Sequence, residues 1–494
     1  MNPLKSLLGQ TAIYGLPTIV GRLLNYFLVP LYTATLPATD YGVVSELYAW
    51  VAFLIVLLTF GMETAFFKFF NDKENKDEVF KNSFLTVLGI NLIFLLLLML
   101  FNQSLADAML YPEHNEYIIL LGVIVCIDAT AALPMAKLRS ENKAKQFSAI
   151  HFTAILVNIG LNLVFLYIFL DPERPEEGIL FILIANLLSS LVKPLAMYKE
   201  FIGIRLKYNV ELGKEMLKYS FPLVIAGFAG IINETLDRAM LKHILHNKAG
   251  LSLLKAQAEL GIYSACYKLA MIVSIFLQAY RYAAEPFFFA QSKNEDRNKL
   301  YVKIMNYFIA AVCLVFLGVA LNIDIFKYFI RSEEYWAGLG VVPILLVANV
   351  FLGIYYNQSI WYKLSGQTRF GAYIAIGGAV ITILINVIFI PTHGYWACAW
   401  ATLIVYGLQM IASYLLGQKY YPINYNLRKF ALYFGLALVL FFITKLVNMD
   451  PKVFTWPKFF FHNALILFYV FVVWFLEKPT PKKPNLSNTE NAMA

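Results

Sequence analysis

Charged residues are scarce in this sequence. Only 14% of its 494 residues are Asp, Glu, Lys or Arg, whereas 60% are hydrophobic. A soluble domain carries about 25% charged and about 45–50% apolar residues, so a water-soluble globular fold is excluded. The remaining alternative is a chain that places most of its apolar surface in lipid.

The sequence has few cysteines and lacks a phosphate-binding loop. The four cysteines are single residues inside apolar segments, which excludes a disulfide framework and offers no cluster of metal ligands. The sequence has no Gly-x-x-x-x-Gly-Lys-Ser/Thr loop, so direct use of nucleotide phosphates is not expected. No nucleophile and base stand at a useful spacing in a loop. We therefore predict that the protein is not an enzyme and carries no cofactor.

Long apolar runs, in contrast, recur along the whole chain. About 20 such residues cross the ~30 Å hydrocarbon core as one helix. The sequence predicts an all-α polytopic membrane protein with about fourteen transmembrane helices. The expected spans are 7–32, 41–66, 80–101, 116–136, 147–170, 178–198, 214–241, 259–285, 302–321, 338–362, 370–390, 394–416, 430–447 and 457–476.

The distribution of charge indicates the orientation in the membrane. The net charge is +9, and Lys and Arg gather in loops that face the cytoplasm if the N-terminus is inside. The loop DPERPEEG at 171–178 carries four acids and one Arg, as an outer loop should. The positive-inside rule therefore predicts that both termini are cytoplasmic. The expected outer loop at 242–260 carries three lysines and fits this topology least well.

The chain contains an internal repeat. YGLP at 14–17 recurs as YSFP at 219–222, and DYGVVSELY at 40–48 recurs as ELGIYSACY at 259–267. A third pair, LNLVFLYIFL and INVIFIPTHG, aligns Asn162 with Asn386. The period of about 205 to 225 residues corresponds to six spans.

Because six is even, both copies enter the membrane with the same orientation. Such parallel repeats form two lobes around an axis along the membrane normal, with a central cavity between them. We expect one lobe at 1–210, the second at 211–420, two extra helices at 421–478 and a disordered cytoplasmic tail at 479–494. Two facing lobes favour transport by alternating access.

Two cations within spans are the first candidates for substrate binding. Arg22 on span 1 and Lys268 on span 8 lie at similar depth on opposite lobes, and neither is repeated in the other lobe. Ionisable groups in a membrane are costly and point to function. Asn25 and Tyr26 share a helix face with Arg22, as Tyr267 does with Lys268. These five residues could line a cavity that binds phosphate or pyrophosphate.

A second charged group lies in IINETLDRAM at 231–240. Glu234 and Arg238 are spaced i, i+4, so they are expected to pair and to close the outer end of the cavity. Asp237 faces another side of the helix and is a candidate ligand for a coupling ion. Asp128 on span 4 has no cation near it in sequence. Its two alternative roles are a proton or cation site and a hydrogen bond to a neighbouring helix, and the second is the one we expect.

Several segments resemble the Wzx-type polysaccharide-export flippases of the multidrug/oligosaccharidyl-lipid/polysaccharide (MOP) exporter superfamily. The resemblance covers about residues 5 to 416 and implies a MATE/MOP-like fold. The segments that carry it are PLYTATLPATDYG at 30–42, TLDRAML at 235–241, ELGIYSACYKLA at 259–270, AEPFFFA at 284–290 and INVIFIP at 385–391.

The resemblance implies a function and a cation site. Such flippases move undecaprenyl-diphosphate-linked oligosaccharide, a unit of O-antigen, capsule or exopolysaccharide, from the inner to the outer leaflet of the bacterial inner membrane. Partners would be the lipid-linked glycan, membrane lipid and polysaccharide polymerase or glycosyltransferase machinery, with no nucleic acid. Coupling could use Na⁺, H⁺ or the membrane potential. Some relatives bind Na⁺ between spans 7, 11 and 12, and the residues that fall at similar places here are Asp237, Thr382, Asn386, Cys398 and Thr402.

Three other functions remain open on the sequence. The first is a lipid II flippase, which would have the same number of spans. The second is a cation-coupled multidrug antiporter, against which Arg22 and Lys268 argue. The third is an integral membrane glycosyl- or phosphotransferase, which would need acidic or histidine clusters in its loops.

Overall fold

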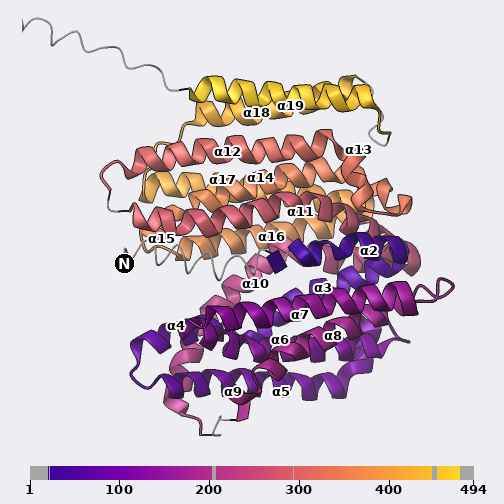
Figure 1. Ribbon diagram of the computed structural model, residues 1–494, viewed down its shortest axis with the longest axis vertical. Coiled ribbons are helices and arrows are strands. Elements are labelled where there is room, and N and C mark those ends of the chain that lie inside the picture. Colours follow the sequence, from indigo (N-terminus) through magenta and orange to yellow (C-terminus); the bar gives the residue numbers. More distant parts are fainter. Residues whose placement is uncertain (1–19, 22, 203–206, 293, 448–452, 479–494) are drawn as a thin grey trace, which may run out of the picture.

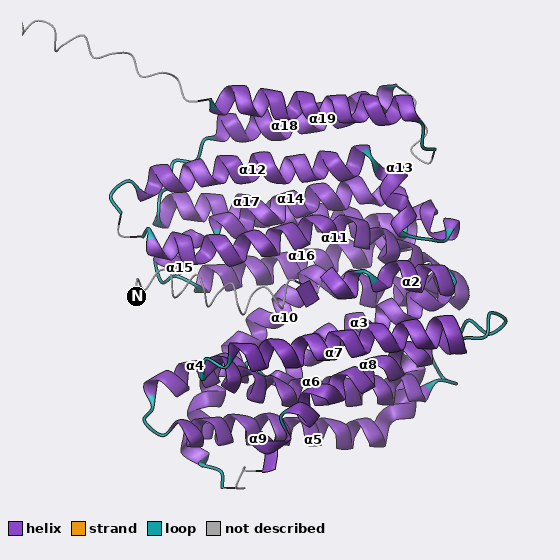
Figure 2. Cartoon of the chain, in the orientation of Figure 1, coloured by secondary structure: helices purple, strands orange, loops and turns teal. Residues whose placement is uncertain are grey.

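The computed structural model describes residues 20, 21, 23–202, 207–292, 294–447 and 453–478. Helices and their connecting loops make up all of this described part (Figure 2). Thirteen helical segments in it are long and apolar enough to cross a membrane. They coincide with the second to fourteenth predicted spans. Most of the first predicted span lies outside the described residues.

The helices follow one another with short connections. Their bounds are α2 Leu28–Thr35, α3 Ala38–Thr59, α4 Met62–Asp72, α5 Lys76–Ala108, α6 Asn115–Ser140, α7 Ala144–Val164, η1 Phe165–Phe169, α8 Glu177–Ala196, α9 Tyr198–Ile202, α10 Val210–Asn247, α11 Leu253–Ala290, α12 Arg297–Leu321, α13 Ile323–Phe326, η2 Lys327–Phe329, η3 Glu333–Val341, α14 Val342–Gln358, α15 Ile360–Leu364, α16 Arg369–His393, α17 Tyr395–Tyr420, α18 Leu427–Leu446 and α19 Trp456–Glu477.

Local sequence explains where several of these helices begin and bend. The side chains of Asn75, Asn209 and Ser252 accept hydrogen bonds from backbone N–H groups in the first turns of α5, α10 and α11. The second span breaks into α3 and α4 at Phe60 and Gly61, which both have positive φ. Glycine adopts that conformation readily, and this break lets α4 leave the axis of α3.

The order of the chain divides the molecule in space. Helices α3 to α9 form one half, α11 to α17 form the other, and α18 with α19 lies along the outer edge of the second half (Figure 1). Helix α10 runs between the halves and packs against both α3 and α16. Large apolar side chains are exposed on the outward faces, for example Leu96 and Leu100 of α5. Such faces are suited to contact with lipid.

Helices α10 and α11 are longer than the sequence suggested. The predicted outer loop at 242–260 is wrong over most of its length, because α10 continues to Asn247 and α11 begins at Leu253. Each helix has 38 residues, or about 57 Å at 1.5 Å per residue, which exceeds the hydrocarbon thickness. Lys242, which had been counted among the loop charges, is a fully buried helical residue. Its charge is neutralised by the carboxylate of Glu46 on α3.

The two halves meet closely at the end where α3 and α11 begin. Tyr335 donates a hydrogen bond to the carbonyl oxygen of Leu36 at 2.8 Å, and the backbone N–H of Ala38 donates to Glu334 at 3.1 Å. The backbones of Gly42 and Gly261 also approach there, and a Cβ on Gly42 would lie 2.1 Å from the carbonyl oxygen of Gln257. This end of the interface is therefore closed.

Candidate functional site

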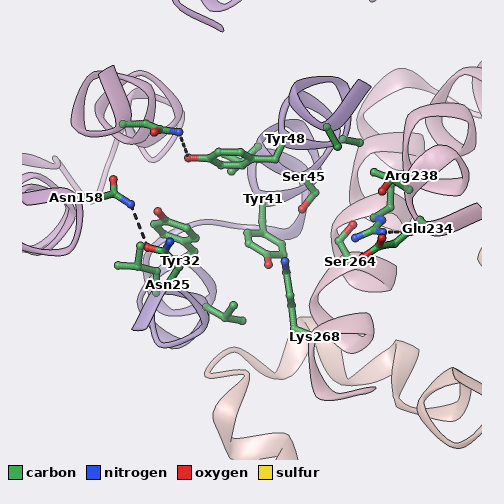
Figure 3. Close-up of a pocket in the computed structure, with 17 residues that line it drawn as sticks. Asn25, Tyr32, Tyr41, Ser45, Tyr48, Asn158, Glu234, Arg238, Ser264 and Lys268 are labelled. Atoms are coloured by element: carbon green, nitrogen blue, oxygen red, sulfur yellow. Dashed lines mark hydrogen bonds between the residues drawn. The ribbon is translucent and has the colours of Figure 1, made fainter. Parts of the chain in front are cut away.

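A cavity of about 400 Å³ lies between the halves, just inside the closed end (Figure 3). Its first wall comes from the residues before α2 and from α2, α3, α7 and α8. Its second wall comes from α10 and α11. The volume falls at the lower end of the range for small-molecule sites, about 300–1,000 Å³. In this conformation the cavity can hold the head of a ligand and not a long oligosaccharide.

The α10–α11 wall is charged. Arg238 and Glu234 come from α10 and Lys268 from α11, and these three are the charged members of the described cavity lining. The guanidinium of Arg238 lies 4.4 Å from the ring centre of Tyr267 and donates to the backbone carbonyl oxygen of Glu234. Glu234 also lines the cavity, and the ion pair that Arg238 makes is with Asp237. Ring stacking and the carbonyl contact hold the Arg238 fork in one orientation.

Lys268 and Ser264 extend this wall along α11. The side chain of Lys268 reaches across the cavity towards Tyr41 (Figure 3). Ser264, one turn earlier, is buried, and its hydroxyl has no hydrogen-bond partner among the described residues. A buried hydroxyl without a partner is unfavourable, so it is available to a ligand. With Arg238, this wall presents two cations and a free hydroxyl to one space.

The opposite wall is polar and, among the described lining residues, uncharged. It carries three amides, from Asn25, Asn158 and Asn186. It also carries three tyrosines, Tyr32, Tyr41 and Tyr48, with Ser45 between the last two. Asn186 donates to the Tyr48 hydroxyl at 2.9 Å, and Asn158 donates to Asn25 at 3.4 Å. We call Asn25, Asn158, Asn186, Tyr32 and Tyr48 the amide–tyrosine wall.

The structure separates the five residues predicted to bind pyrophosphate. Asn25 and Lys268 line the cavity. Arg22 lies outside the described residues. Tyr26 stacks on Phe329 with ring centres 4.4 Å apart and does not line the cavity. Tyr267 lies under the guanidinium of Arg238, so it can act on a ligand through that side chain.

The predicted ion pair between Glu234 and Arg238 is replaced by a different arrangement. Arg238 makes its ion pair with Asp237, at 3.5 Å between Nε and Oδ1, and binds the backbone of Glu234. The carboxylate of Asp237 also accepts from the Tyr263 hydroxyl at 2.5 Å and from the backbone N–H of Arg238 at 2.8 Å. Arg238 pairs with Asp237 and not with Glu234 because Asp237 is buried. A buried carboxylate has lost its hydration and needs a nearby positive charge more than the exposed carboxylate of Glu234 does.

The predicted cation ligands lie where α10, α16 and α17 pack together. Thr382 donates to the side-chain oxygen of Asn233 at 3.2 Å, and Thr402 donates to the carbonyl oxygen of Cys398 at 2.9 Å. Asn386 is fully buried, and neither its amide oxygen nor its nitrogen has a partner among the described residues. These neutral oxygens fit a weakly bound monovalent cation, although Asp237 is already engaged. Cation binding here stays a prediction.

Sequence reasoning missed several residues of the cavity. Arg238 was placed in an outer closure and is instead a second cavity cation beside Lys268. Asn158, Asn186 and Tyr48 were not identified from the sequence as lining residues. The internal repeat aligns Ser45 with Ser264, and both of these serines line the cavity. Uncharged polar residues inside apolar spans were the available signal. Whether such a residue faces the cavity depends on the rotation of its helix in the bundle, which the sequence does not specify.

Ion pairs outside the cavity hold helices together, and two of them involve acids of predicted spans. Asp128 pairs with Lys193 of α8 at 2.7 Å. The cation that is absent from the sequence around Asp128 therefore comes from a neighbouring helix. Fully buried Glu46 of α3 contacts Lys242 at 2.6 Å and His243 at 2.8 Å, both on α10. Tyr111 also donates to Glu46 at 2.5 Å. The Glu46 cluster therefore joins α3 to α10 close to the closed end.

The fold is shared with solved structures of a lipid II flippase and of MATE proteins. The chain is similar to the lipid II flippase MurJ in its inward closed conformation, with a TM-score of 0.67 and 14% identity over 94% of this chain and 98% of that one. It is also similar to a MATE transporter in complex with MaD3S, with a TM-score of 0.60 and 17% identity over 85% and 98% of the two chains. At these identities the similarity establishes the fold alone. Another similar structure is an inward-facing multidrug resistance MATE family transporter of the MOP superfamily.

Sequence comparison gives the family. An uncharacterized membrane protein of Haemophilus influenzae is 21% identical over 296 residues, which cover 58% of this chain and 66% of the relative. The chain thus spans just under two thirds of that relative's length. Residues 7–291 match the family of polysaccharide biosynthesis proteins. This chain belongs to that family and is a multi-pass membrane protein with the fold of the MurJ and MATE structures.

Proposed function

We propose that this protein translocates a polyprenyl-diphosphate-linked oligosaccharide from the inner to the outer leaflet of a bacterial cytoplasmic membrane. The lipid carrier would be undecaprenyl diphosphate, and the glycan a unit of O-antigen, capsule or exopolysaccharide. Membership of a polysaccharide biosynthesis family supports a sugar-bearing substrate. The even internal repeat supports alternating access between the two leaflets.

The observation that carries this proposal is the pair of cations in the cavity. Lys268 and Arg238 lie on adjacent helices of one wall, and Arg238 is oriented by Tyr267. A diphosphate offers acceptor oxygens on two phosphorus atoms, which matches one ammonium and one planar guanidinium. The low dielectric of a membrane interior strengthens both contacts. Cationic drugs would meet repulsion from the same two groups, which disfavours a multidrug antiporter.

The transport cycle would alternate between the two ends of the cavity. The end near Gly42 and Gly261 is closed, and the positive-inside rule assigns it to the outer side with both termini in the cytoplasm. In this state the cavity would receive its ligand from the inner leaflet. The driving force would be Na⁺, H⁺ or the membrane potential, and Asn386 with the oxygens around it is the candidate cation site.

Lipid II is the second candidate substrate, because the similar MurJ structure is that of a lipid II flippase. Both substrates share the diphosphate and differ in the attached sugars. Reconstituted protein that moves polyprenyl-diphosphate glycans without a peptide and ignores lipid II would support the first proposal. The opposite preference would replace it.

The cation pair is tested by measuring translocation in reconstituted vesicles. The substrate is a fluorescent undecaprenyl-diphosphate sugar, and the variants are Lys268→Ala and Arg238→Ala. A hydrogen bond to a charged group contributes about 1.5–3 kcal/mol, so each variant should slow translocation by about tenfold to hundredfold.

The control is Lys248→Ala, which removes an exposed lysine at the closed end without touching the cavity. It should leave the rate unchanged. Near-normal translocation by the Lys268→Ala, Arg238→Ala double variant, inserted at normal levels, would rule out a cation-bound diphosphate.

A further inference from the structure

The two walls of the cavity differ in chemistry. The described charged lining residues all belong to α10 and α11, whereas every amide in the lining comes from the other half of the molecule. Amides and hydroxyls both donate and accept hydrogen bonds, as the hydroxyl groups of a sugar require. A purely anionic ligand would need donors on every side. The asymmetry indicates a ligand with one charged part and one neutral, polyhydroxylated part.

The hydrogen bonds of the amide–tyrosine wall form a chain that leaves some of its polar groups available to a ligand. Tyr32 donates to Asn162 at 3.0 Å, Asn162 donates to Asn158 at 3.1 Å, and Asn158 donates to Asn25. This chain runs in one direction and ends on the amide group of Asn25, whose nitrogen remains a donor. The network fixes the orientation of each amide before a ligand arrives.

A similar pair lies on the neighbouring helices α3 and α8. The amide nitrogen of Asn186 donates to the Tyr48 hydroxyl, so the hydroxyl proton of Tyr48 can be donated to a ligand. The amide oxygen of Asn186 remains an acceptor. The half-buried ring of Tyr48 adds an apolar face beside these groups. Donor, acceptor and flat apolar surface together suit a pyranose ring.

We infer that the amide–tyrosine wall is a sugar subsite that binds the uncharged sugar attached directly to the diphosphate. Lys268 and Arg238 bind the diphosphate across from it. The small volume of the cavity confines recognition in this conformation to that first sugar. The inference rests on the proposed function and adds to it the residues that determine substrate specificity.

The subsite is tested by binding to the purified full-length protein in detergent. Three defined probes are compared: geranylgeranyl diphosphate, the same diphosphate carrying glucose, and the same diphosphate carrying glucuronic acid. The variants are Tyr48→Phe and Asn186→Ala. The matched control is Tyr167→Phe, which alters an exposed tyrosine on η1 that does not line the cavity. The readout is the ratio of the dissociation constants for the bare and glucosylated probes.

Glucose should tighten binding to the wild-type protein, and each variant should reduce that gain by about fivefold, the value of one hydrogen bond near 1 kcal/mol. Binding of the bare diphosphate should change less than about twofold, because its partners are on the other wall. Lys268→Ala should weaken the binding of all three probes by the same factor. Tyr167→Phe should match the wild type throughout.

Different failures have different meanings. If the wild type binds none of the probes, the proposed function itself is wrong. If it binds the bare diphosphate but glucose adds nothing, or if Tyr48→Phe and Asn186→Ala leave the glucose gain intact, the sugar subsite is overturned. Tighter binding of the glucuronic acid probe than of the glucose probe would overturn the assignment of an uncharged first sugar.

Discussion

At the scale of single residues, charges inside this molecule have two distinct roles. Lys268 and Arg238 face a cavity, whereas Lys242 is fully buried against Glu46. Lys242 also donates to the backbone carbonyl oxygen of Met109 at 2.6 Å and lies 3.8 Å from the ring centre of Tyr111. Its surroundings leave no place for a ligand, so its role is to hold α10 against α3.

We expect Lys242→Met to lower the stability of the protein strongly. Removing one partner of a buried ion pair leaves an uncompensated charge, which costs about 3–5 kcal/mol. Thermal unfolding of the purified protein in detergent measures the effect. The control is Lys248→Met, at an exposed residue that directly follows the end of α10.

The double variant Glu46→Gln, Lys242→Met separates charge from packing. It removes both charges and should recover much of the lost melting temperature, because the desolvation cost disappears with them. Equal melting temperatures for the double variant and Lys242→Met alone would contradict a role in charge compensation.

At the scale of elements, the contact between α3 and α11 closes one end of the cavity. Gly42 and Gly261 occupy the same position in the two copies of the repeat, within DYGVVSELY and ELGIYSACY. A Cβ on Gly261 would lie 1.9 Å from the carbonyl oxygen of Ala38, and a Cβ on Gly42 would meet the backbone of Gln257. Only glycine lets the two helix backbones approach this closely, so the repeated motif forms the closure.

Gly42→Ala and Gly261→Ala should therefore hold this end of the cavity open. The added methyl groups meet backbone atoms, which cannot move aside as a flexible side chain can. We expect a cysteine placed at Ser45, on the cavity wall, to react faster with an impermeant maleimide added from the outside in these variants.

Gly89→Ala on α5 provides the control, since a Cβ there would meet nothing within 4 Å. It should leave the reactivity at Ser45 unchanged. Equal reactivity in the Gly42→Ala and control proteins would contradict the closure by glycine contact.

At the scale of the whole molecule, the membrane orientation decides which leaflet the cavity serves. The fold itself is compatible with either orientation, because a helix bundle can cross the membrane both ways. Only the asymmetry of basic loops favours cytoplasmic termini. The four native cysteines are buried, so single introduced cysteines can be labelled with little background.

We expect Lys248→Cys, in the loop between α10 and α11, to react with an impermeant maleimide in intact cells. Glu295→Cys, in the loop between α11 and α12, should react only after the membrane is made permeable. Both positions are exposed, so accessibility in the protein does not distinguish them. The reverse pattern would place the closed end in the cytoplasm and reverse the proposed direction of transport.

The sequence alone determined the all-helical architecture and the placement of the helices in the described part of the chain. Solvation by lipid requires apolar runs of about 20 residues, so composition and periodicity are sufficient to find them. Lys268 was also found from sequence, because a charge within such a run is costly wherever the helix faces. The loop at 242–260 was the main error, since charged residues there belong to helices that extend beyond the hydrocarbon.

Only the tertiary structure decided which polar residues share a space. Glu46 and Lys242 are 196 positions apart, and Asn25 and Asn158 are 133 apart, yet each pair is in contact. A single asparagine or tyrosine in an apolar helix has no preferred direction until neighbouring helices fix its rotation. The same packing places the guanidinium of Arg238 over the ring of Tyr267 and against the backbone carbonyl oxygen of Glu234. Helix packing therefore converted scattered polar residues into one charged wall and one wall whose described residues are uncharged.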